Sequence, residues 1–538
     1  MTRNQVRRQE NNLPEPQGPN LPLEEVALHL HPKDSVAVAK TGLHPGSVLV
    51  WTHVLRGPEH IPVGQPVLMG HKVALREIPA GEPVYKYGQP IGFASESIRP
   101  GQHVHDHNVD PRPLEQDYAF GADAEPVEVV PRAQRHSFLG FKRADGRVGT
   151  RNYVAIIPSV HCAIQVCRGI ARHFTPERLA PFPNVDGVLA LTHTAGCGGS
   201  MDYAILQRTL AGMARHPNAG AYVLVGLGCE GNQVEEMSAQ YGLARPRAGE
   251  HNDRSIALVI QDVGGTARTV RAGIDAVARM LPVVNDVQRT PQPLSELRLA
   301  TQCGGSDGWS GITANPLVGR VADEIVRQGG TVVLSETPEI CGAEHLLTRR
   351  AVSSQVGQDL LAKLHWWEDY VQRQGTVLDN NPGPGNRAGG ISNIYEKSLG
   401  AIAKSGSTPL MAVHDYADPL DGQGLVFMDS PGDDAVAITG MVAGGCTLVV
   451  FTTGRGSVSG SEAAPCIKVC SNSTTYDHMV EDMDLNAGRI LEPGVDPEEL
   501  ASELLDLVIA VASGQLTKSE RMYVGEGEFM PWTPTGTI

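Results

Sequence analysis

From about residue 150 onward, short apolar segments alternate with helical patterns, and glycine-rich loops follow many of the apolar segments. The apolar segments are 153–158, 185–191, 221–226, 255–260, 297–303, 330–335, 409–413 and 447–451. The helical patterns include 161–174, 317–328 and 497–513. Short apolar strands that alternate with helices predict βαβ units and parallel sheets. This alternation constrains the fold most strongly, and it predicts a multidomain α/β protein.

Reactive side chains follow several of these predicted strands. Cysteine, histidine or glutamate stands beside glycine in the loops that begin near residues 192, 226, 303 and 335. Open α/β sheets bind ligands at such strand ends, so these loops are candidates for a site. In the alternative interpretation, the glycines only form turns and the cysteines are small buried hydrophobic side chains. A nucleotide site is not favoured, because residues 226–230 lack the third glycine of G-x-G-x-x-G.

The sequence pattern before residue 136 differs from that of the rest of the chain. Residues 35–39, 47–51 and 82–87 are apolar or alternating runs between glycine and proline, which predicts short strands. Residues 109–135 are acidic and contain prolines without helical periodicity, which is typical of a linker. The predicted parts are a disordered tail (1–22), a β-rich domain (23–112), a linker (113–135), a second α/β domain (136–290) and a C-terminal α/β domain (291–538).

Composition limits the partners of this chain. Its 538 residues carry a formal net charge of −16, which disfavours a nucleic-acid partner. Its apolar runs are shorter than the ~20 residues that cross a bilayer, which disfavours a membrane protein. The nine cysteines are an odd number without a C-x-x-C pair, which disfavours a disulfide framework and predicts a cytoplasmic protein with reduced thiols.

Histidines gather near residue 105. His105 and His107 have i, i+2 spacing, which places both on one face of a strand. Together with His71 and Lys72 they predict a proton-transfer or metal site, since imidazole serves both purposes at neutral pH. The alternative is a set of ordinary surface or turn histidines.

The last third adds candidates for substrate contacts. Arg455 follows an apolar strand between two glycines, where a guanidinium could grip a carboxylate with two hydrogen bonds. A solvated loop arginine is the alternative. Asn393, Asp484 and Asn486 could supply oxygen ligands, although such residues in loops also form turns.

Several short motifs occur in a fixed order along the chain. They are His31-Pro32-Lys33-Asp34, Gly70-His71-Lys72, Lys86-Tyr87-Gly88, Val104-His105-Asp106-His107-Asn108, Gly149-Thr150-Arg151-Asn152, Gly228-Cys229-Glu230, Cys303-Gly304-Gly305-Ser306-Asp307, Glu396-Lys397-Ser398 and Thr453-Gly454-Arg455-Gly456. In this order the chain resembles the altronate and galactarate dehydratases from about residue 25 to its end.

The resemblance implies an N-terminal β-clip (SAF) domain, a second domain that mediates dimerisation and a C-terminal Rossmann-like catalytic domain. It implies a homodimer that uses Fe(II) or Mn(II) and converts a sugar acid such as altronate or galactarate to a 2-keto-3-deoxy acid. Ser35, Ala195 and Cys341 depart from the family pattern, which leaves the particular sugar acid open.

Such an elimination needs a base for the C2 proton, an acid for the leaving hydroxyl and stabilisation of the carboxylate charge. The candidates for proton transfer are His71, Lys72, His105 and His107. The candidates for substrate binding are Arg151, His193, Asn393 and Arg455. The candidates for metal binding are Cys197, Cys229, Glu230, Cys303, Asp307, Glu336 and Glu339.

Two other functions compete with this one. The sulfolactate lyases resemble the same two blocks and eliminate sulfite, but they divide the blocks between two subunits. A protein that binds a sugar acid without reaction is the other alternative, and the presence of His71, His105, His107, Cys229 and Glu230 speaks against it.

Overall fold

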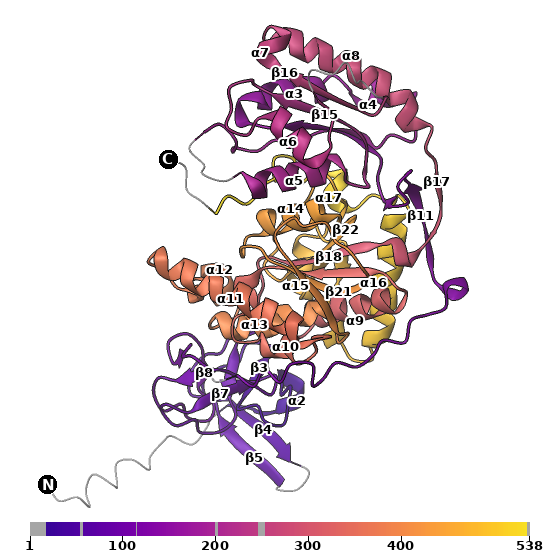
Figure 1. Cartoon of the computed structure of the whole chain (residues 1–538). Helices are drawn as coiled ribbons and strands as arrows, with labels where there is room; N and C mark the ends of the chain where they lie inside the picture. The colour runs from indigo at the N-terminus through magenta and orange to yellow at the C-terminus, as the bar shows by residue number, and fades with distance from the viewer. Residues whose placement is uncertain (1–17, 54–56, 115, 199–202, 246–252, 535–538) are drawn as a thin grey trace, which may run out of the picture. The chain divides into compact units, whose positions relative to one another are not determined.

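The computed structural model describes residues 18–53, 57–114, 116–198, 203–245 and 253–534 (Figure 1). The chain forms two compact units. The first contains residues 1–115, 306–309 and 379–399, and the second contains 116–305, 310–378 and 400–538. Each unit is described by itself. Among the described residues, each helix is too short or too polar to span a bilayer.

The first unit is built from small, mainly antiparallel sheets, as the strand pattern before residue 113 predicts. One sheet has the order β2-β3-β6-β9, another has β1-β4-β5 and a third has β10-β8-β7. Their bounds are β1 (Asn20–Pro22), β2 (Ala27–Leu28), β3 (Val36–Ala39), β4 (Val48–His53), β5 (Gly57–Pro62), β6 (Lys72–Ala74), β7 (Pro83–Lys86), β8 (Gln89–Ala94), β9 (His103–Val104) and β10 (Val109–Asp110). Ala37, Leu49 and Val73 belong to its buried core.

Two segments from the second half of the chain complete this unit, which the sequence does not reveal. Residues 306–309 and 379–399 include α12 (Pro384–Ala388) and the start of α13 (Ile394–Ile402). Glycines allow their close approach, since a Cβ on Gly308 or Gly390 would lie 2.0 or 2.4 Å from the carbonyl oxygen of Gly70. Gly390 also has a φ of +107°, which other residues rarely adopt.

The second unit begins with a parallel four-stranded sheet in the order β14-β13-β15-β16. These strands are β13 (Tyr153–Pro158), β14 (Gly187–Ala190), β15 (Ala219–Gly226) and β16 (Ser255–Val259). The surrounding helices are α3 (Ile164–Ala171), α4 (Pro176–Leu179), α5 (Ala204–Ala214), α6 (Val234–Tyr241), α7 (Ile260–Val263) and α8 (Thr266–Asn285). One core joins α3 and α8 to the sheet, through Ile170 and Val277 among others. The predicted strands and parallel pairing are confirmed here.

A parallel seven-stranded sheet forms the rest of the second unit, in the order β20-β21-β19-β18-β22-β23-β24. Its strands are β18 (Arg298–Cys303), β19 (Thr331–Leu334), β20 (Leu410–His414), β21 (Gly424–Met428), β22 (Leu448–Thr453), β23 (Cys466–Cys470) and β24 (Leu485–Asn486). The larger helices are α9 (Ala314–Arg327), α11 (Ser354–Arg373), α14 (Asp434–Gly444) and α16 (Pro497–Ala512) (Figure 1). The strand order reverses beside β18, as in doubly wound folds. It differs from the Rossmann order because β21 lies between β20 and β19.

Three details differ from the sequence prediction. Residues 20–22 of the predicted tail form β1, which pairs with β4, while residues 1–17 lie outside the described residues. The predicted linker is held on the second unit from residue 116, for Gly121, Asp123 and Val130 donate backbone hydrogen bonds to Thr348, Arg349 and Arg327. Cys466 and Cys470 lie on strand β23 rather than at helical spacing, and both are buried.

Candidate active site and metal centres

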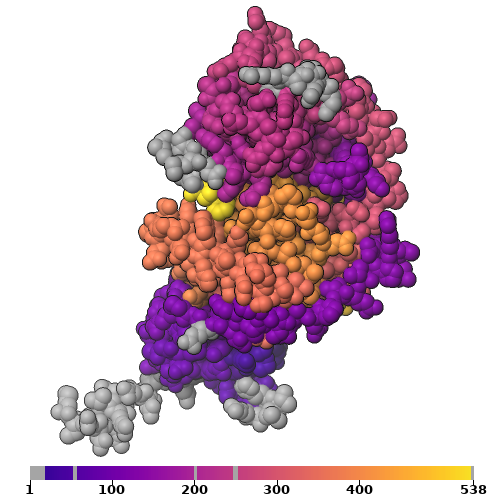
Figure 2. Space-filling model, viewed as in Figure 1, coloured from indigo at the N-terminus to yellow at the C-terminus, as the bar shows by residue number. Residues whose placement is uncertain are grey.

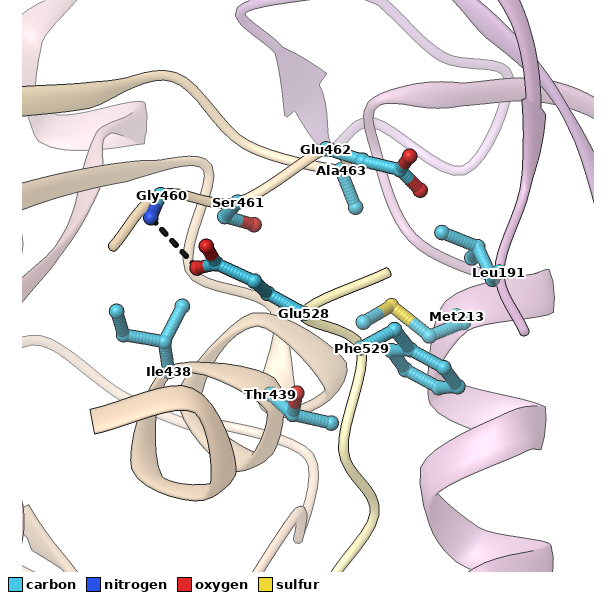
Figure 3. Close-up of a pocket in the computed structure, with 10 residues that line it drawn as sticks. All are labelled: Leu191, Met213, Ile438, Thr439, Gly460, Ser461, Glu462, Ala463, Glu528 and Phe529. Carbon is cyan, nitrogen blue, oxygen red and sulfur yellow. Dashed lines mark hydrogen bonds between the residues drawn. The ribbon is translucent and has the colours of Figure 1, made fainter. Parts of the chain in front are cut away.

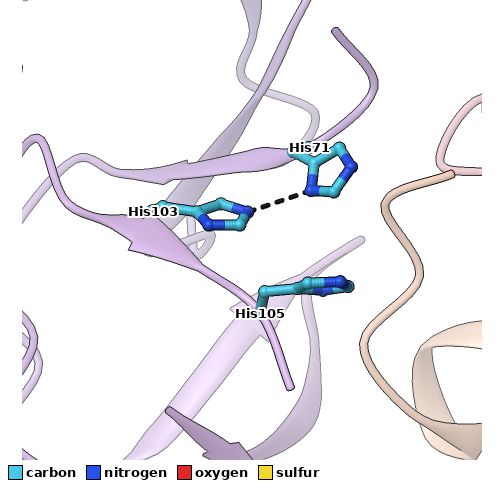
Figure 4. A group of neighbouring side chains, drawn as sticks. All are labelled: His71, His103 and His105. Atoms are coloured by element: carbon cyan, nitrogen blue, oxygen red, sulfur yellow. Dashed lines mark hydrogen bonds between the residues drawn. The ribbon is translucent and has the colours of Figure 1, made fainter. Parts of the chain in front are cut away.

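Three imidazoles meet in the first unit, and we call His71, His103 and His105 the histidine triad. His71 precedes β6, His103 lies on β9, and antiparallel pairing of Lys72 with Val104 brings the two strands together. The three rings lie close together (Figure 4), with one ring nitrogen from each within 4.8 Å of the others. His103, in register with His105 and His107, was not among the predicted residues, although the His-x-His-x-His repeat at strand spacing could have revealed it.

The hydrogen bonds of the triad fix one tautomer. His71 Nε2 lies 3.2 Å from the carbonyl oxygen of Ala388, which can only accept, so His71 carries its proton on Nε2. His71 Nδ1 then accepts from His103 Nε2 at 2.9 Å (Figure 4). His105 Nδ1 is buried and has no hydrogen-bond partner among the described residues. The triad therefore holds a buried imidazole nitrogen that lacks a protein partner.

The triad is kept neutral by burial and by a neighbouring cation. Burial, followed by repulsion from His71, lowers the pKa of His103 to about 3. Burial, followed by repulsion from the Lys72 ammonium, lowers the pKa of His105 to about 4. Burial also lowers the pKa of His71. At neutral pH all three rings are neutral imidazoles with one protonated and one unprotonated nitrogen, and the unprotonated nitrogen is the one that can bind a metal.

A buried charge network lies beside the triad. Glu396 accepts from Lys72 Nζ and Lys86 Nζ, both at 2.8 Å, and all three side chains are at most 1% exposed. Lys72 also donates to the Gly390 carbonyl at 2.7 Å. Burial, partly offset by Glu396, lowers the pKa of Lys72 to about 8. The two ammonium groups and one carboxylate leave a net positive charge that favours an anionic ligand. Lys86 and Glu396 were not predicted as site residues.

A second group lies at the reversal point of the seven-stranded sheet, and we call Cys303, Glu336, Glu339 and Lys404 the switch-point group. One ligand atom each of Cys303, Glu336 and Glu339 lies within 4.8 Å of the others, and all three residues are buried. Lys404 Nζ is 2.7 Å from Cys303 Sγ. Although burial opposes it, the charges of Cys303, Glu336 and Glu339 raise the pKa of Lys404. Lys404 was not predicted.

The backbone at this group is constrained. Glu336 has a φ of +71°, a left-handed conformation that costs a non-glycine residue about 1–3 kcal/mol and is found mainly at functional positions. Arg455, at the end of the neighbouring strand β22, donates its backbone N–H to the Gly305 carbonyl at 2.8 Å. Its side chain is exposed and forms no hydrogen bond or ion pair within the described part of the chain. The guanidinium is therefore available to a ligand.

Comparison with known proteins identifies the family. Models of the altronate/galactarate dehydratase SAF domain, the D-galactarate dehydratase/altronate hydrolase second domain and the D-galactarate/altronate dehydratase C-terminal domain match residues 25–112, 140–285 and 294–537. The chain is 35% identical to altronate dehydratase of Bacillus subtilis, over 92% of this chain and 96% of that one. This chain belongs to the galactarate/altronate dehydratase family. It is an enzyme of the hydro-lyase class.

Two further relatives have different substrates in their names. Galactarate dehydratase (L-threo-forming) of Escherichia coli is 36% identical over 91% of this chain and 93% of its own. The β subunit of (2R)-sulfolactate sulfo-lyase from Chromohalobacter salexigens is 32% identical over 73% of this chain and 96% of its own. The resemblance to the galactarate/altronate dehydratases that the motifs suggest is thus confirmed.

The chain does not gather all predicted substrate residues at one place. Arg151 is fully buried, and its guanidinium binds Glu520 at 2.7 and 2.8 Å and the Val511 carbonyl at 2.9 Å. Asn393 is also buried, and it donates to the Ile91 carbonyl and accepts from the Glu396 amide. These contacts give both residues structural roles. We therefore do not carry Arg151 and Asn393 into the proposed site.

Other predicted residues in this dehydratase also have internal partners. Glu230 accepts from Ser159 Oγ at 2.8 Å and from the amides of Leu227 and Gly228 at 3.1 and 2.5 Å, which makes it a brace between loops. Asp307 lies in the first unit, where it accepts from the Trp309 amide at 3.1 Å. His107 is exposed, with its ring 5.3 Å from that of His103.

A pocket of about 490 Å³ opens in the second unit of this dehydratase. His161, His193 and Cys197 form part of its wall, and Phe529 and Trp532 from the C-terminal segment line it as well. Figure 2 shows yellow atoms of that segment between magenta and orange parts of this unit. His193 donates from Nε2 to the Pro158 carbonyl at 2.9 Å and accepts from the Ala195 amide at 3.2 Å. Both nitrogens of His193 are thus used internally.

A smaller cavity of about 10 Å³ lies nearby and has room for about one water molecule (Figure 3). Glu528 at its rim accepts from the Gly460 amide at 2.8 Å. Burial, followed by repulsion from Glu526, raises the pKa of Glu462 to about 8. Glu462 Oε2 is buried without a hydrogen-bond partner among the described residues. This cavity is too small for a sugar acid.

Lowering the pH should reduce the stability of this protein at pH values well above those at which ordinary carboxylates are protonated. Burial lowers the pKa of His193 to about 4 and that of His216 to about 3, as it does for His103 and His105. Below pH 6.5 the unfolded chain binds protons at these positions and the folded chain does not, so the free energy of unfolding falls as pH drops from about 6.5 towards 4. Melting curves of the chelated protein between pH 7.5 and 5 should show a progressive fall in Tm. A Tm that is constant over this range would contradict the prediction.

Proposed function

We propose that this enzyme removes water from a sugar acid, an aldonate or aldarate of the altronate or galactarate kind, to give a 2-keto-3-deoxy acid. The names of its relatives support this substrate class. The observation that carries the proposal is the histidine triad, where neutral imidazoles and an unpartnered His105 Nδ1 adjoin a net positive buried network. This combination suits a divalent metal and an anionic substrate.

The donor chemistry of the triad fits the proposed Fe(II) or Mn(II) cofactor. Imidazole is a common ligand of Fe(II), and neutral rings need no proton release before binding at pH 7. His71, His103 and His105 would hold the ion. When bound, a metal of this kind stabilises the charge that develops on the substrate carboxylate as the C2 proton leaves.

The protein's own groups prepare this chemistry. Lys72 acts on the triad by electrostatics, because its buried ammonium disfavours a proton on His105. Lys72 and Lys86 oppose the general repulsion that an acidic protein exerts on an anionic substrate. With a pKa of about 8, Lys72 could also exchange a proton near neutral pH. We infer that Lys72 is a positioning residue, since its side chain is fully buried.

The switch-point group is the alternative metal site. Its thiol and two carboxylates fit Fe(II) or Mn(II) by ligand type, as the sequence predicts. Lys404 already places a cation next to Cys303, so a metal there would have to share or displace that charge. This contact favours the triad. Arg455 remains the candidate for binding a substrate carboxylate.

Elimination of sulfite from a sulfonate is the second candidate function, and the similarity to the sulfolactate lyase subunit favours it. Both reactions begin with loss of a proton next to a carboxylate and differ in the leaving group. The dehydratase relatives match 91–92% of this chain, including its SAF domain, whereas the sulfo-lyase β subunit covers 73% of it, and this difference favours the dehydratase.

A panel of sugar acids tests the proposal. Purified protein, chelated and then reloaded with Fe(II) or Mn(II) under reducing conditions, should form a 2-keto-3-deoxy acid from at least one aldonate or aldarate. Sulfolactate, with sulfite release as the readout, is the matched comparison. Sulfite release without keto-acid formation from any sugar acid would favour the second function. If a sugar acid raised the Tm but gave no product, the protein would bind sugar acids without reacting with them. If metal-free protein turned over, the reaction would not require a metal.

A further inference from the structure

The second unit carries a group of reactive side chains that the proposed function does not use. His161, Cys162, Cys197 and Cys229, which we call the cysteine cluster, lie in the loops after three adjacent strands, β13, β14 and β15. His161 Nε2 is 3.6 Å from Cys162 Sγ. One ligand atom each of His161, Cys162 and Cys197 lies within 4.8 Å of the others. All four residues are exposed, and the three thiols are free.

Buried polar contacts hold these loops in place. The His161 amide donates to the Ala195 carbonyl at 3.0 Å, which joins the first loop to the second. The Gly231 amide donates to the Cys197 carbonyl at 2.8 Å, which joins the second loop to the third. Two side chains join the third loop to the first. Glu230 accepts a hydrogen bond from Ser159 Oγ, and the side-chain amide of Asn232 donates to the Ser159 carbonyl at 2.9 Å. These hydrogen bonds therefore fix the positions of the three loops that carry the cluster.

Glycine permits the closest of these approaches. Gly196 precedes Cys197 and has a φ of +97°. A Cβ on Gly196 would lie 2.3 Å from the Ser159 carbonyl oxygen, so another residue would push the second loop away from the first. Cys229 is oriented by Gln261, whose Nε2 donates to its sulfur at 3.4 Å. The chain geometry thus brings one imidazole and up to three sulfurs to one place.

We propose that the cysteine cluster is a separate site for a single thiophilic divalent ion, Zn²⁺ or Fe²⁺, with His161, Cys162 and Cys197 as ligands and Cys229 as the fourth. Thiolate and imidazole are the donors that these ions prefer. Metal–sulfur bonds of about 2.3 Å in tetrahedral geometry put ligand atoms ~3.8 Å apart, which small side-chain movements reach from the present spacing.

The exposure of the cluster predicts that solvent reaches the bound ion, although its four proposed ligands all come from the protein. Structural zinc sites with four protein ligands usually give solvent little access. Here His161 and Cys197 also line the pocket of about 490 Å³, so an ion in the cluster would face that pocket. We therefore expect a chelator to remove the ion from the folded protein without unfolding it.

Metal binding by the full chain tests this site independently of turnover. Reduced, chelated protein is titrated with Co²⁺, whose sulfur charge-transfer absorption reports thiolate ligands, and Zn²⁺ content is measured after dialysis. Cys162→Ser and Cys197→Ser should each lose about one equivalent of Zn²⁺ and weaken binding more than ~100-fold, because even residues behind the ligands contribute about 10–100-fold. Cys167→Ala, which removes a buried thiol of α3, is the matched control and should bind as wild type.

The outcomes separate this site from the proposed active site. His105→Ala should retain the Co²⁺–sulfur absorption, since the triad is in the other unit. Equal Zn²⁺ binding by wild type, Cys162→Ser and Cys197→Ser would overturn the proposal. A Cys162–Cys197 disulfide in protein purified under reducing conditions would overturn it as well, and so would iron with acid-labile sulfide, which indicates an iron–sulfur cluster.

Discussion

Replacing Glu396 with glutamine should lower the stability of the first unit by about 3–5 kcal/mol, the usual cost of breaking a buried ion pair. Glu396 is buried and accepts hydrogen bonds from Lys72, Lys86 and Ser392. Glutamine keeps the size but removes the charge, so two buried ammonium groups would lose their counter-ion. Calorimetry of the full chain should show the transition of this unit at a lower temperature.

A surface pair provides the matched control. Glu503 pairs with Arg489 at 2.9 Å, but its side chain is 52% exposed. Glu503→Gln should change stability by less than ~1 kcal/mol, because solvent screens exposed pairs. Adding Lys72→Met to Glu396→Gln should recover part of the loss, since one uncompensated ammonium is removed. If Glu396→Gln melted like Glu503→Gln, the buried network would not stabilise the fold.

Replacing His105 with alanine should lower turnover by at least ~100-fold while leaving Tm nearly unchanged. His105 offers the unpartnered nitrogen of the triad, so its loss removes a proposed metal ligand without breaking a side-chain hydrogen bond. Even mutation of a residue that hydrogen-bonds to a metal ligand lowers metal affinity or activity by about 10–100-fold. Excess metal should restore part of the turnover by occupying the weakened site. His60→Ala, an exposed histidine on β5, should behave as wild type.

Unchanged turnover of His105→Ala would mean that the triad is structural. A loss of turnover that excess metal does not restore, together with unchanged metal affinity, would instead support the proton-transfer role that the sequence suggests for His105. The two roles are therefore separable by the metal dependence of a single variant.

Local pattern was sufficient to predict most of the fold of the second unit. Strands β13, β15 and β22 contain continuous apolar runs because both faces of a parallel sheet are covered, and such runs are visible in the sequence. Strand β23 was missed, because its Cys-Ile-Lys-Val-Cys sequence carries a lysine. That lysine is buried and lies over the Phe451 ring at 4.9 Å, a tertiary contact that no local pattern shows.

The candidate site was predicted only in part, and the missing part is non-local. The i, i+2 spacing of His105 and His107 identifies His105, and the Gly70-His71-Lys72 motif identifies His71. Glu396 could not be linked to Lys72 because 324 positions separate them, and the link depends on residues 379–399 joining the first unit. For Arg151, in contrast, the sequence predicts a substrate contact that the structure does not support. It belongs to a family motif and suits a carboxylate, but the carboxylate it binds is Glu520.

The division of the predicted metal ligands has a similar cause. Cys197 and Glu339 follow strands and Cys303 ends one, which is why the sequence groups them. These strands belong to two different sheets, so the structure assigns Cys197 to the cysteine cluster and the other two to the switch-point group. Strand ends reveal where chemistry can occur, but sheet membership decides which residues act together.

We propose that the metal required for turnover binds the histidine triad. Titration of chelated protein with Mn(II), followed by the electron paramagnetic resonance signal of the free ion, tests this most directly. We predict that wild type and Glu339→Gln bind one Mn(II) with similar affinity, and that His105→Ala binds it at least ~10-fold more weakly. Normal binding by His105→Ala together with lost binding by Glu339→Gln would place the ion at the switch-point group and contradict the account.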